Sequence, residues 1–260
     1  TNAAEARGPG WHATMSSIRR PHLRLLSLNV NGLRSNPEKR RQLFHGIQQG
    51  RYDIICLQET HHSSEAEASQ WMQEGSGPGS AWLGPAYWCH FSTASRGVAI
   101  LFSNTLPWAD IHRVGNDPFG RLLRVDFTFQ GNPFTVTTVY APCDAASRPP
   151  FFTHLHTHFA NTTGRYVLCG GDFNCVADRR LDRVTAALAQ QSTLPAGPRN
   201  QPGTAITDQQ PRILRSATTS IPTNAREHGF AELQNCMQQL SWTDSWRQRH
   251  TTDRAFTYVN

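Results

Sequence analysis

Apolar runs of strand length recur along the chain from Leu23 onward. Several are β-branched and bounded by Gly, Pro or Asn, which is the pattern of buried strands in a globular domain. The runs are Leu23–Val30, Ile54–Leu57, Val98–Phe102, Leu122–Phe129, Phe134–Tyr140 and Tyr166–Cys169. Each run predicts a β-strand.

Two of these runs lie close together in the sequence and predict a hairpin. From Leu123 to Phe129, apolar residues alternate with Arg124, Asp126 and Thr128. Only Gln130–Pro133 separates this run from the next one. A connection this short joins antiparallel strands.

Helical patterns lie between the strands. Asn36 offers an N-cap, Pro37 a first-turn proline and Glu38 a first-turn acid, and the helix they open ends at Gly50. A second helix opens at Pro149–Pro150. The apolar stripes of the three predicted helices are Leu43, Phe44 and Ile47; Phe151, Phe152, Leu155 and Phe159; and Phe230, Leu233, Met237 and Leu240. Mixed strands and helices with a hairpin predict an α/β or α+β sandwich, with sheets covered by helices.

A chain of 260 residues is long enough for one domain with a large core. We expect residues 1–21 to be a disordered leader, residues 22–260 to form the domain, and residues 184–224 to be a surface insertion without clear periodicity. No apolar run approaches the ~20 residues that span a bilayer, and the first ten residues have no secretory pattern. We therefore expect no membrane partner.

The charge balance is mildly basic. Lys and Arg number 25 against 19 Asp and Glu, for a net charge of +6, which suits a polyanionic partner without requiring one. Lys39 is the only lysine, and genomic base composition explains this arginine bias at least as well as phosphate binding does. The six cysteines include no C-x-x-C pair. We expect them to be buried free thiols in a reducing nuclear or cytoplasmic compartment.

Polar side chains follow several of the apolar runs directly. These segments are Asn29–Gly32, Gln58–Thr60, Tyr140–Pro142 and Gly170–Asn174. If the strands are neighbours, their amides, carboxylates and phenol gather at one rim of the sheets, where rigid elements usually hold binding and catalytic residues.

The carboxylates of Glu59 and Asp172, with the amides of Asn29, Asn31 and Asn174, form an oxygen-rich set that suits Mg²⁺ or Mn²⁺ and not Zn²⁺. Such an ion polarises a phosphoryl oxygen, while Asp172 could activate a water and Asn174 could hold it in line. Phosphodiester hydrolysis is the natural reaction. Each residue alone also has an ordinary structural explanation, such as a turn for Asn31-Gly32.

Other candidate residues have weaker patterns. Arg34, Lys39, Arg40 and Arg41 could contact a phosphate backbone or could form a charged helix face. His154 and His158, at helical spacing, could bind a metal or face solvent. No G-x-S-x-G or P-loop motif occurs, which argues against a serine hydrolase and a nucleoside triphosphatase.

Taken together and in this order, the motifs resemble the endonuclease/exonuclease/phosphatase superfamily. They are Asn-Val-Asn-Gly-Leu at 29–33, Gln-Glu-Thr at 58–60, Arg-Gly-Val-Ala-Ile-Leu at 96–101, Tyr-Ala-Pro at 140–142 and Gly-Asp-Phe-Asn at 171–174. Leu181-Asp182-Arg183 and Thr243–Arg247 add a resemblance to the endonuclease domain of LINE-type (non-LTR) retrotransposons, which is similar to the abasic-site endonucleases. The resemblance implies a four-layered α/β sandwich, with two packed mixed sheets flanked by helices.

Carried over by position, the resemblance implies a role for each motif residue. Glu59 would be the metal ligand, Asn29 would contact the metal site and the scissile phosphate, and Tyr140 would contact the phosphate. Asp172 would activate the attacking water and Asn174 would position it. Asn31 stands where abasic endonucleases tend to carry Asp, so the resemblance leaves open a second metal there.

The resemblance also implies a Mg²⁺-dependent endonuclease that nicks DNA, within a polyprotein that carries a reverse transcriptase downstream. The family's closing strand and Ser-Asp-His motif should follow Tyr258, so we expect the last strands to be missing and the 260-residue chain to nick DNA weakly or not at all. Two alternatives stay open. One is a phosphatase of the same superfamily that acts on inositol phosphates or lipids, and the other is a catalytically dead DNA-binding fragment.

Overall fold

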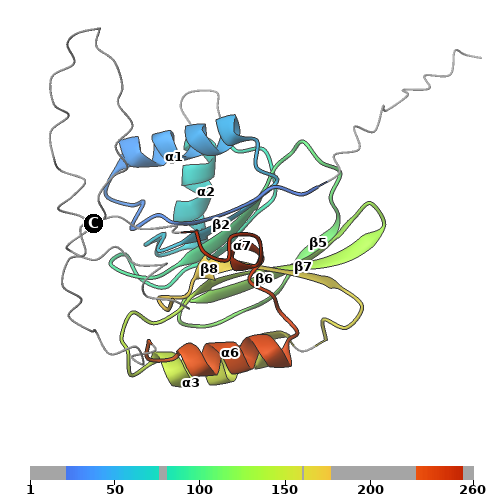
Figure 1. Ribbon diagram of the computed structural model, residues 1–260. Coiled ribbons are helices and arrows are strands. Elements are labelled where there is room, and N and C mark those ends of the chain that lie inside the picture. Colours follow the sequence, from blue (N-terminus) through green and yellow to red (C-terminus); the bar gives the residue numbers. More distant parts are fainter. Residues whose placement is uncertain (1–21, 76–80, 160, 177–226, 254–260) are drawn as a thin grey trace, which may run out of the picture.

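Two four-stranded β-sheets pack face to face in the computed structural model, which describes residues 22–75, 81–159, 161–176 and 227–253 (Figure 1). The first sheet has the order β1-β2-β4-β3 and the second the order β5-β6-β7-β8. Their strands are β1 (Leu25–Asn29), β2 (Ile54–Gln58), β3 (Ala86–Cys89), β4 (Val98–Phe102), β5 (Ala109–Asn116), β6 (Leu122–Phe129), β7 (Asn132–Tyr140) and β8 (Tyr166–Asp172). The expected leader and insertion lie outside the described residues.

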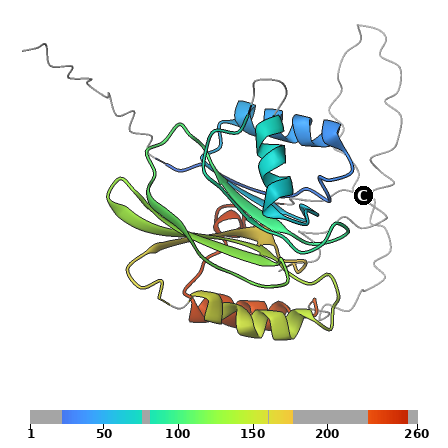
Figure 2. The same cartoon turned by 180° about the vertical axis from the view of Figure 1, so that it is seen from behind.

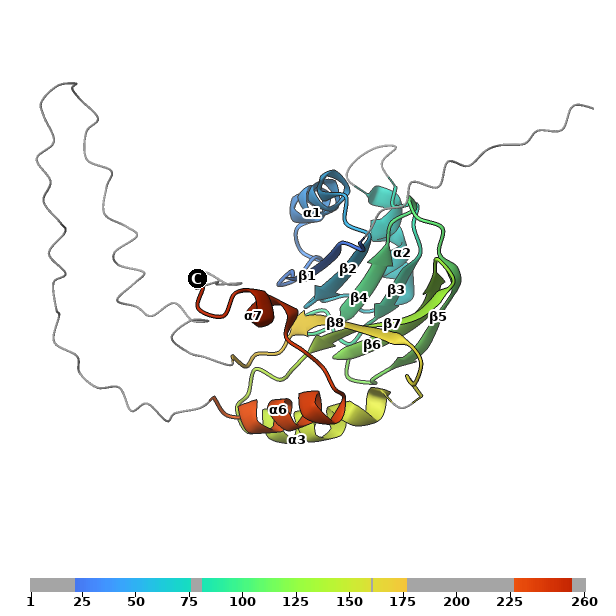
Figure 3. The same ribbon diagram turned by 45° about the vertical axis from the view of Figure 1, so that its right-hand side comes forward.

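Helices cover the outer face of each sheet, as the view from behind and the side view show (Figures 2 and 3). The first sheet carries α1 (Pro37–Gly50) and α2 (Glu65–Glu74), and the second carries α3 (Arg148–Leu155) and α6 (Phe230–Gln239). A 3-10 turn, η1 (His156–Phe159), extends α3, and α7 (Ser245–Arg249) follows α6. None of the helices described is long and apolar enough to cross a membrane. The four-layered α/β sandwich predicted from the sequence is confirmed.

Each sheet contains one parallel pair of strands. β1 runs parallel to β2, with Asn29 opposite Gln58, and β7 runs parallel to β8, with Tyr140 opposite Asp172. The other neighbours pair antiparallel, including the predicted hairpin of β6 and β7. Parallel neighbours end at the same edge of their sheet, so each sheet presents two carboxyl-terminal strand ends together.

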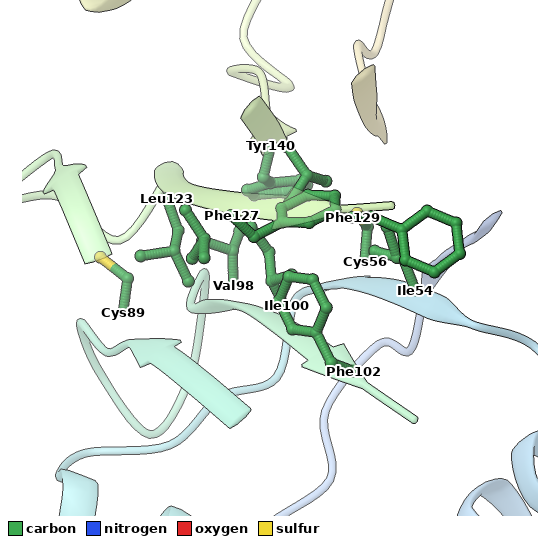
Figure 4. Close-up of a cluster of buried hydrophobic side chains, with 12 residues drawn as sticks. Ile54, Cys56, Cys89, Val98, Ile100, Phe102, Leu123, Phe127, Phe129 and Tyr140 are labelled. Atoms are coloured by element: carbon green, nitrogen blue, oxygen red, sulfur yellow. The ribbon is translucent and has the colours of Figure 1, made fainter. Parts of the chain in front are cut away.

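Large apolar side chains fill the space between the two sheets (Figure 4). Phe102 of β4 meets Phe127 of β6 edge to face, with ring centroids 5.3 Å apart, and both are fully buried. Separate clusters lie under the helices, where Phe44 of α1 packs on the first sheet and Phe152 of α3 on the second. Burial of these apolar faces holds the four layers together.

The structure changes some boundaries of the predicted elements. β4, β6 and α1 have the predicted bounds, and the Asn36 side chain caps α1 by accepting a hydrogen bond from Lys39 N at 2.9 Å. The predicted four-residue hairpin connection is wrong, since β7 begins at Asn132 and only Gln130 and Gly131 form the turn. Both have positive φ, 51° and 77°, as a tight hairpin turn requires.

Four elements, β3, β5, α2 and α7, were not predicted from the apolar pattern. β5 is an edge strand whose residues are mostly exposed, so it lacks the alternation of a half-buried strand. α2 begins with a detectable cap, in which Ser64 Oγ accepts from Glu67 N while Glu67 accepts from Ser63 N. That Ser-x-x-Glu spacing was the available signal for this helix.

The cysteines only partly match expectation. All six are free thiols, and Cys56, Cys89 and Cys236 are buried. Cys143 is exposed, because it lies in the loop after β7 and not in an apolar run.

His62 is fully buried between Trp71 and Trp88, with its ring 5.0 Å from the Trp88 ring. Its Nδ1 lies 2.8 Å from Thr60 Oγ1, and its Nε2 has no hydrogen-bond partner among the described residues. Burial, followed by the nearby charge of His90, lowers the pKa of His62 from 6.5 to about 4. A protonated imidazole would therefore be an uncompensated charge in the core.

We predict that the fold loses stability in mild acid through His62. The unfolded chain takes up a proton near pH 6.5 and the folded chain only near pH 4, so this contribution is full above pH 6.5 and falls as the pH drops toward 4. Between pH 7 and pH 5 the loss should be about 2 kcal/mol. Urea unfolding of the wild type and of His62→Phe at both pH values measures it, with exposed His45→Gln as control. Equal pH dependence in wild type and His62→Phe would contradict this account.

Candidate functional site

One amide joins the ends of three strands at the rim of the sandwich. Asn29 ends β1, Glu59 follows β2 and Asp172 ends β8. Asn29 Nδ2 donates to Glu59 Oε1 at 2.7 Å and to Asp172 Oδ2 at 2.9 Å. The two carboxylates belong to different sheets and are 113 residues apart in the chain. The Asn29 side chain lies between them and bonds both.

A buried polar link lies directly beneath this cluster. Gln58, the last residue of β2, is 1% exposed, and its Nε2 donates to Thr138 Oγ1 of β7 at 2.9 Å and to Ser27 Oγ of β1 at 3.3 Å. These bonds tie the two sheets together one residue before Glu59, so they limit how far the carboxylates can move apart.

Asn174 is held beside Asp172 by two directed hydrogen bonds. Its backbone N donates to Asp172 Oδ1 at 2.9 Å, and its side-chain Nδ2 donates to Ala141 O at 2.9 Å. The Arg148 guanidinium donates to the Asn174 carbonyl. The loop after β8 therefore packs against the loop after β7, where Tyr140 ends its strand.

Glu59 is an ionised acid in this site. Burial would raise its pKa, but hydrogen bonds from Asn29, Tyr140 and His61 outweigh that effect and lower the pKa below its ordinary value. His61 Nε2 lies 3.3 Å from Glu59 Oε2, and both side chains are mostly buried. The carboxylate is thus charged at neutral pH and already oriented.

Tyr140 keeps its phenolic proton. Burial raises its pKa strongly, and its hydrogen bonds to Cys143 and Glu59 add to the shift. The Tyr140 hydroxyl lies 2.9 Å from Cys143 Sγ, and the residue is 5% exposed. The Tyr140 O–H is therefore a neutral hydrogen-bond donor at the base of the site, where it bonds Glu59.

Asn31 is exposed and joins the site through its backbone. Its N donates to Asn29 Oδ1 at 2.9 Å, and its carbonyl accepts from Lys39 Nζ at 2.9 Å. Its backbone has φ 43°, and Glu59, His61 and Asn174 are also left-handed, with φ of 55°, 55° and 48°. Non-glycine residues in this region are uncommon and gather at functional sites when their surroundings hold them there.

The donor chemistry of the rim fits a hard divalent cation. Glu59 and Asp172 supply carboxylate oxygens, and Asn29 and Asn31 carry amide oxygens. In the part of the chain that the structure describes, no three His, Cys, Asp or Glu side chains gather as a metal-binding group. An ion here would take one or two carboxylates and complete its shell with water and substrate oxygens, which is the usual habit of Mg²⁺.

The basic residues after the first motif do not form one group. Arg40 is 6% exposed and donates to Glu74 Oε2 at 2.8 Å as well as to the Leu33 carbonyl. Its guanidinium therefore stabilises the fold and is not placed to contact a phosphate backbone. Arg34 pairs with Glu67 and Arg41 with Glu38, and both remain exposed. Lys39 lies nearest the site through its bond to Asn31.

The three histidines His154, His156 and His158 lie on α3 and on the 3-10 turn η1 that extends it. His154 and His158 are both exposed, and His154 Nδ1 lies 2.7 Å from the Pro150 carbonyl of its own helix. This fits the solvent-facing reading, and no metal-binding group of His, Cys, Asp or Glu is found there among the described residues.

Sequence reasoning missed three residues at the site: His61, Arg121 and Cys143. His61 had a signal, since it follows Glu59 by two positions in the same loop. Arg121 donates to Tyr140 O at 3.2 Å, and its guanidinium lies 5.5 Å from the centre of the Tyr140 ring. Cys143 also had a signal, since it directly follows the Tyr140–Pro142 motif, whereas Arg121 reaches the site through loop geometry that the sequence pattern does not display.

Most of this chain resembles a curated protein in sequence. A Xenopus laevis protein described as "Transposon TX1 uncharacterized 149 kDa protein" is 29% identical over 238 residues, which cover 91% of this chain and 14% of that protein. The chain therefore spans about a seventh of the length of that relative.

Two solved structures align with about two thirds of the chain at low sequence identity. An AP endonuclease from Archaeoglobus fulgidus has a TM-score of 0.47 at 16% identity, covering 63% of this chain and 62% of that one. A humanized D. rerio TDP2 has a TM-score of 0.45 at 19% identity, covering 67% and 68%.

A family model described as "Endonuclease/Exonuclease/phosphatase family" matches residues 26–257, which include every residue of the rim described above. The match runs through all four layers and ends beyond α7. The chain belongs to the endonuclease/exonuclease/phosphatase family.

Proposed function

We propose that this domain hydrolyses phosphodiester bonds with the help of a divalent metal ion and that its substrate is DNA, which it nicks on one strand. The observation that carries the proposal is the Asn29 amide bridging Glu59 and Asp172. It holds an oxygen-donor pair at one rim, next to a protonated tyrosine and a fixed asparagine.

Glu59 would hold Mg²⁺, or Mn²⁺ in its place, with Asn31 as a further oxygen donor. When bound, such an ion supplies charge stabilisation to the phosphoryl and leaving oxygens. Glu59 suits this role because its pKa is lowered and its carboxylate is oriented by Asn29 and His61.

The remaining roles follow from hydrogen-bond chemistry. Asp172 would accept the proton of the attacking water, since its Oδ1 and Oδ2 are both aligned by donors from Asn174 and Asn29. Asn174 would position that water. Tyr140, which stays protonated, would donate to a non-bridging phosphate oxygen, and Asn29 would contact the same phosphate.

DNA is the proposed substrate for two reasons. The chain carries a net charge of +6, and its relative is a transposon protein of much greater length. A domain that nicks DNA in such a protein would leave an end from which a reverse transcriptase, proposed to lie downstream in the same polyprotein, could copy. The cations proposed to contact the backbone of the duplex are the exposed Arg34 and Arg41 and the half-buried Lys39.

We predict that Glu59→Gln lowers Mg²⁺-dependent nicking of supercoiled plasmid by about 10²-fold or more, because it removes the charge of the ligand but keeps its shape. Titration of Mn²⁺ should show weakened binding in the same variant. Glu232→Gln, the same change on α6 in the outer layer, should behave as wild type. The assay uses the 260-residue chain and, in parallel, a version extended at its C-terminus.

The same assay separates the alternatives. Release of phosphate from inositol phosphates without plasmid nicking would favour the phosphatase. DNA binding without hydrolysis by either length would favour the catalytically dead fragment. Undiminished nicking by Glu59→Gln would remove Glu59 as the ligand.

We also predict that duplex affinity falls steeply with salt, with a log–log slope of about −0.9 for each phosphate neutralised. Lys39→Gln and Arg41→Gln should each make the slope shallower by about 0.9, which corresponds to the loss of one phosphate contact. Arg24→Gln, at the opposite end of β1, should leave the slope unchanged. Fluorescence anisotropy across a salt series measures it. An affinity independent of salt would remove the phosphate backbone as the contact.

A further inference from the structure

Two loops next to the rim touch each other closely. The loop of residues 90–97 joins β3 to β4, and the loop of residues 117–121 joins β5 to β6. Gly97 N donates to Gly120 O at 3.0 Å, and a Cβ on Gly120 would lie 2.7 Å from Phe91 Cβ. Gly120 also has φ 65°, so glycine is needed for both the turn and the contact.

Backbone hydrogen bonds fix both loops to the site. His61 N donates to Arg96 O at 3.0 Å, and Thr60 N donates to Gly97 O at 3.1 Å. On the other side, Tyr140 N donates to Arg121 O at 2.7 Å. The two loops therefore bridge from the Glu59 loop to the end of β7, on the rigid edges of both sheets.

These loops expose aromatic rings. Phe91 is 40% exposed and Phe119 is 57% exposed, although most large apolar side chains of the domain are buried. The Arg96 guanidinium lies 4.3 Å from the centre of the Phe91 ring. An exposed aromatic ring with a stacked guanidinium is a surface that suits flat, electron-rich partners.

The same loops carry two guanidiniums, and the one carboxylate among them, that of Asp117, accepts from the backbone N of Arg121 at 2.6 Å. Within the described residues, neither Arg96 nor Arg121 forms an ion pair; Arg96 stacks on Phe91, and Arg121 donates to the Tyr140 carbonyl. Burial lowers the pKa of Arg121, and repulsion from Arg96 adds to the effect. Arg96 and Arg121 belong to the two loops that the hydrogen bond from Gly97 N to Gly120 O joins, so an anion bound beside these loops would meet both positive charges.

We propose that Phe91, Arg96, Phe119 and Arg121 form a platform that binds an unpaired nucleotide next to the phosphodiester bond that is cleaved. The rings would stack on the base, and the guanidiniums would bind the flanking phosphates. The nucleotide must be unpaired, because a base inside a duplex has both faces covered by its neighbours. This proposal rests on the proposed function, since it takes nucleic acid as the substrate.

The test is binding of fluorescein-labelled DNA to the 260-residue chain in EDTA, followed by anisotropy. The probes are a single-stranded oligonucleotide, the matching duplex, and that duplex with one unpaired nucleotide. Wild type should bind the single strand and the bulged duplex more tightly than the plain duplex. Phe119→Ala and Arg96→Gln should each weaken binding to those two probes by about 10-fold, and affect the plain duplex less.

Matched controls lie at the far end of the sheets. Tyr166→Ala removes a ring that is 60% exposed at the start of β8, and Arg24→Gln removes a guanidinium stacked 5.3 Å from the Tyr52 ring centre. Both should bind every probe as wild type does. Thermal unfolding shows whether each variant is folded.

The outcomes separate the platform from the proposed function. If wild type binds DNA and the platform variants bind all probes unchanged, or lose the plain duplex equally, the platform is wrong while DNA remains the partner. If wild type binds none of the probes at low salt, DNA is not the substrate, and both proposals fail.

Discussion

Gly170 lets β8 lie close against β1 and β2, Gly171 lets it lie close against β7, and the bridge from Asn29 to Asp172 depends on this approach. A Cβ at Gly170 would lie 3.2 Å from Ser27 Cβ and 3.4 Å from Cys56 Cβ, and one at Gly171 would lie 2.3 Å from Val139 O. A larger side chain at either position would force β8 away from its neighbours, just before Asp172. The 2.9 Å bond across the two sheets would then be lost, and with it the spacing of the two carboxylates.

Several residues in the loops that follow the strands have a strained backbone conformation. Asn31, Glu59, His61 and Asn174 all have left-handed φ, which costs roughly 1 kcal/mol or more for each non-glycine residue. The surrounding hydrogen bonds offset this conformational cost: Gly32 N donates to Glu59 O at 2.7 Å, and Asn174 N donates to Asp172 Oδ1. The polar groups are therefore placed before any substrate arrives, and a catalytic site gains from such pre-organisation because little reorientation remains.

Sequence pattern was informative where burial dictates residue type and weak where loops decide position. The apolar runs that became β4 and β6 are buried along their length, so their bounds could be read directly. The exposed edge strand β5 left no such trace. For the candidate site, polar residues at strand ends placed Asn29, Glu59 and Asp172, but Arg121 reaches Tyr140 through a turn at Gly120 that only the folded chain displays. Their catalytic roles remain predictions.

Net charge alone could not say where a polyanion would bind, because arginine serves two different purposes here. Arg124 and Arg165 both contact the Asp126 carboxylate, at 3.3 Å and 3.2 Å, and Arg40 is buried against Glu74, so these guanidiniums stabilise the fold. Arg96 and Arg121 instead stack on Phe91 and Tyr140. A charge already paired in low dielectric attracts an incoming anion weakly, whereas one that rests on an aromatic ring keeps most of its field. If the proposed platform binds nucleic acid, a phosphate would therefore meet Arg96 and Arg121, whose loops are hydrogen-bonded to the Glu59 loop and to the end of β7.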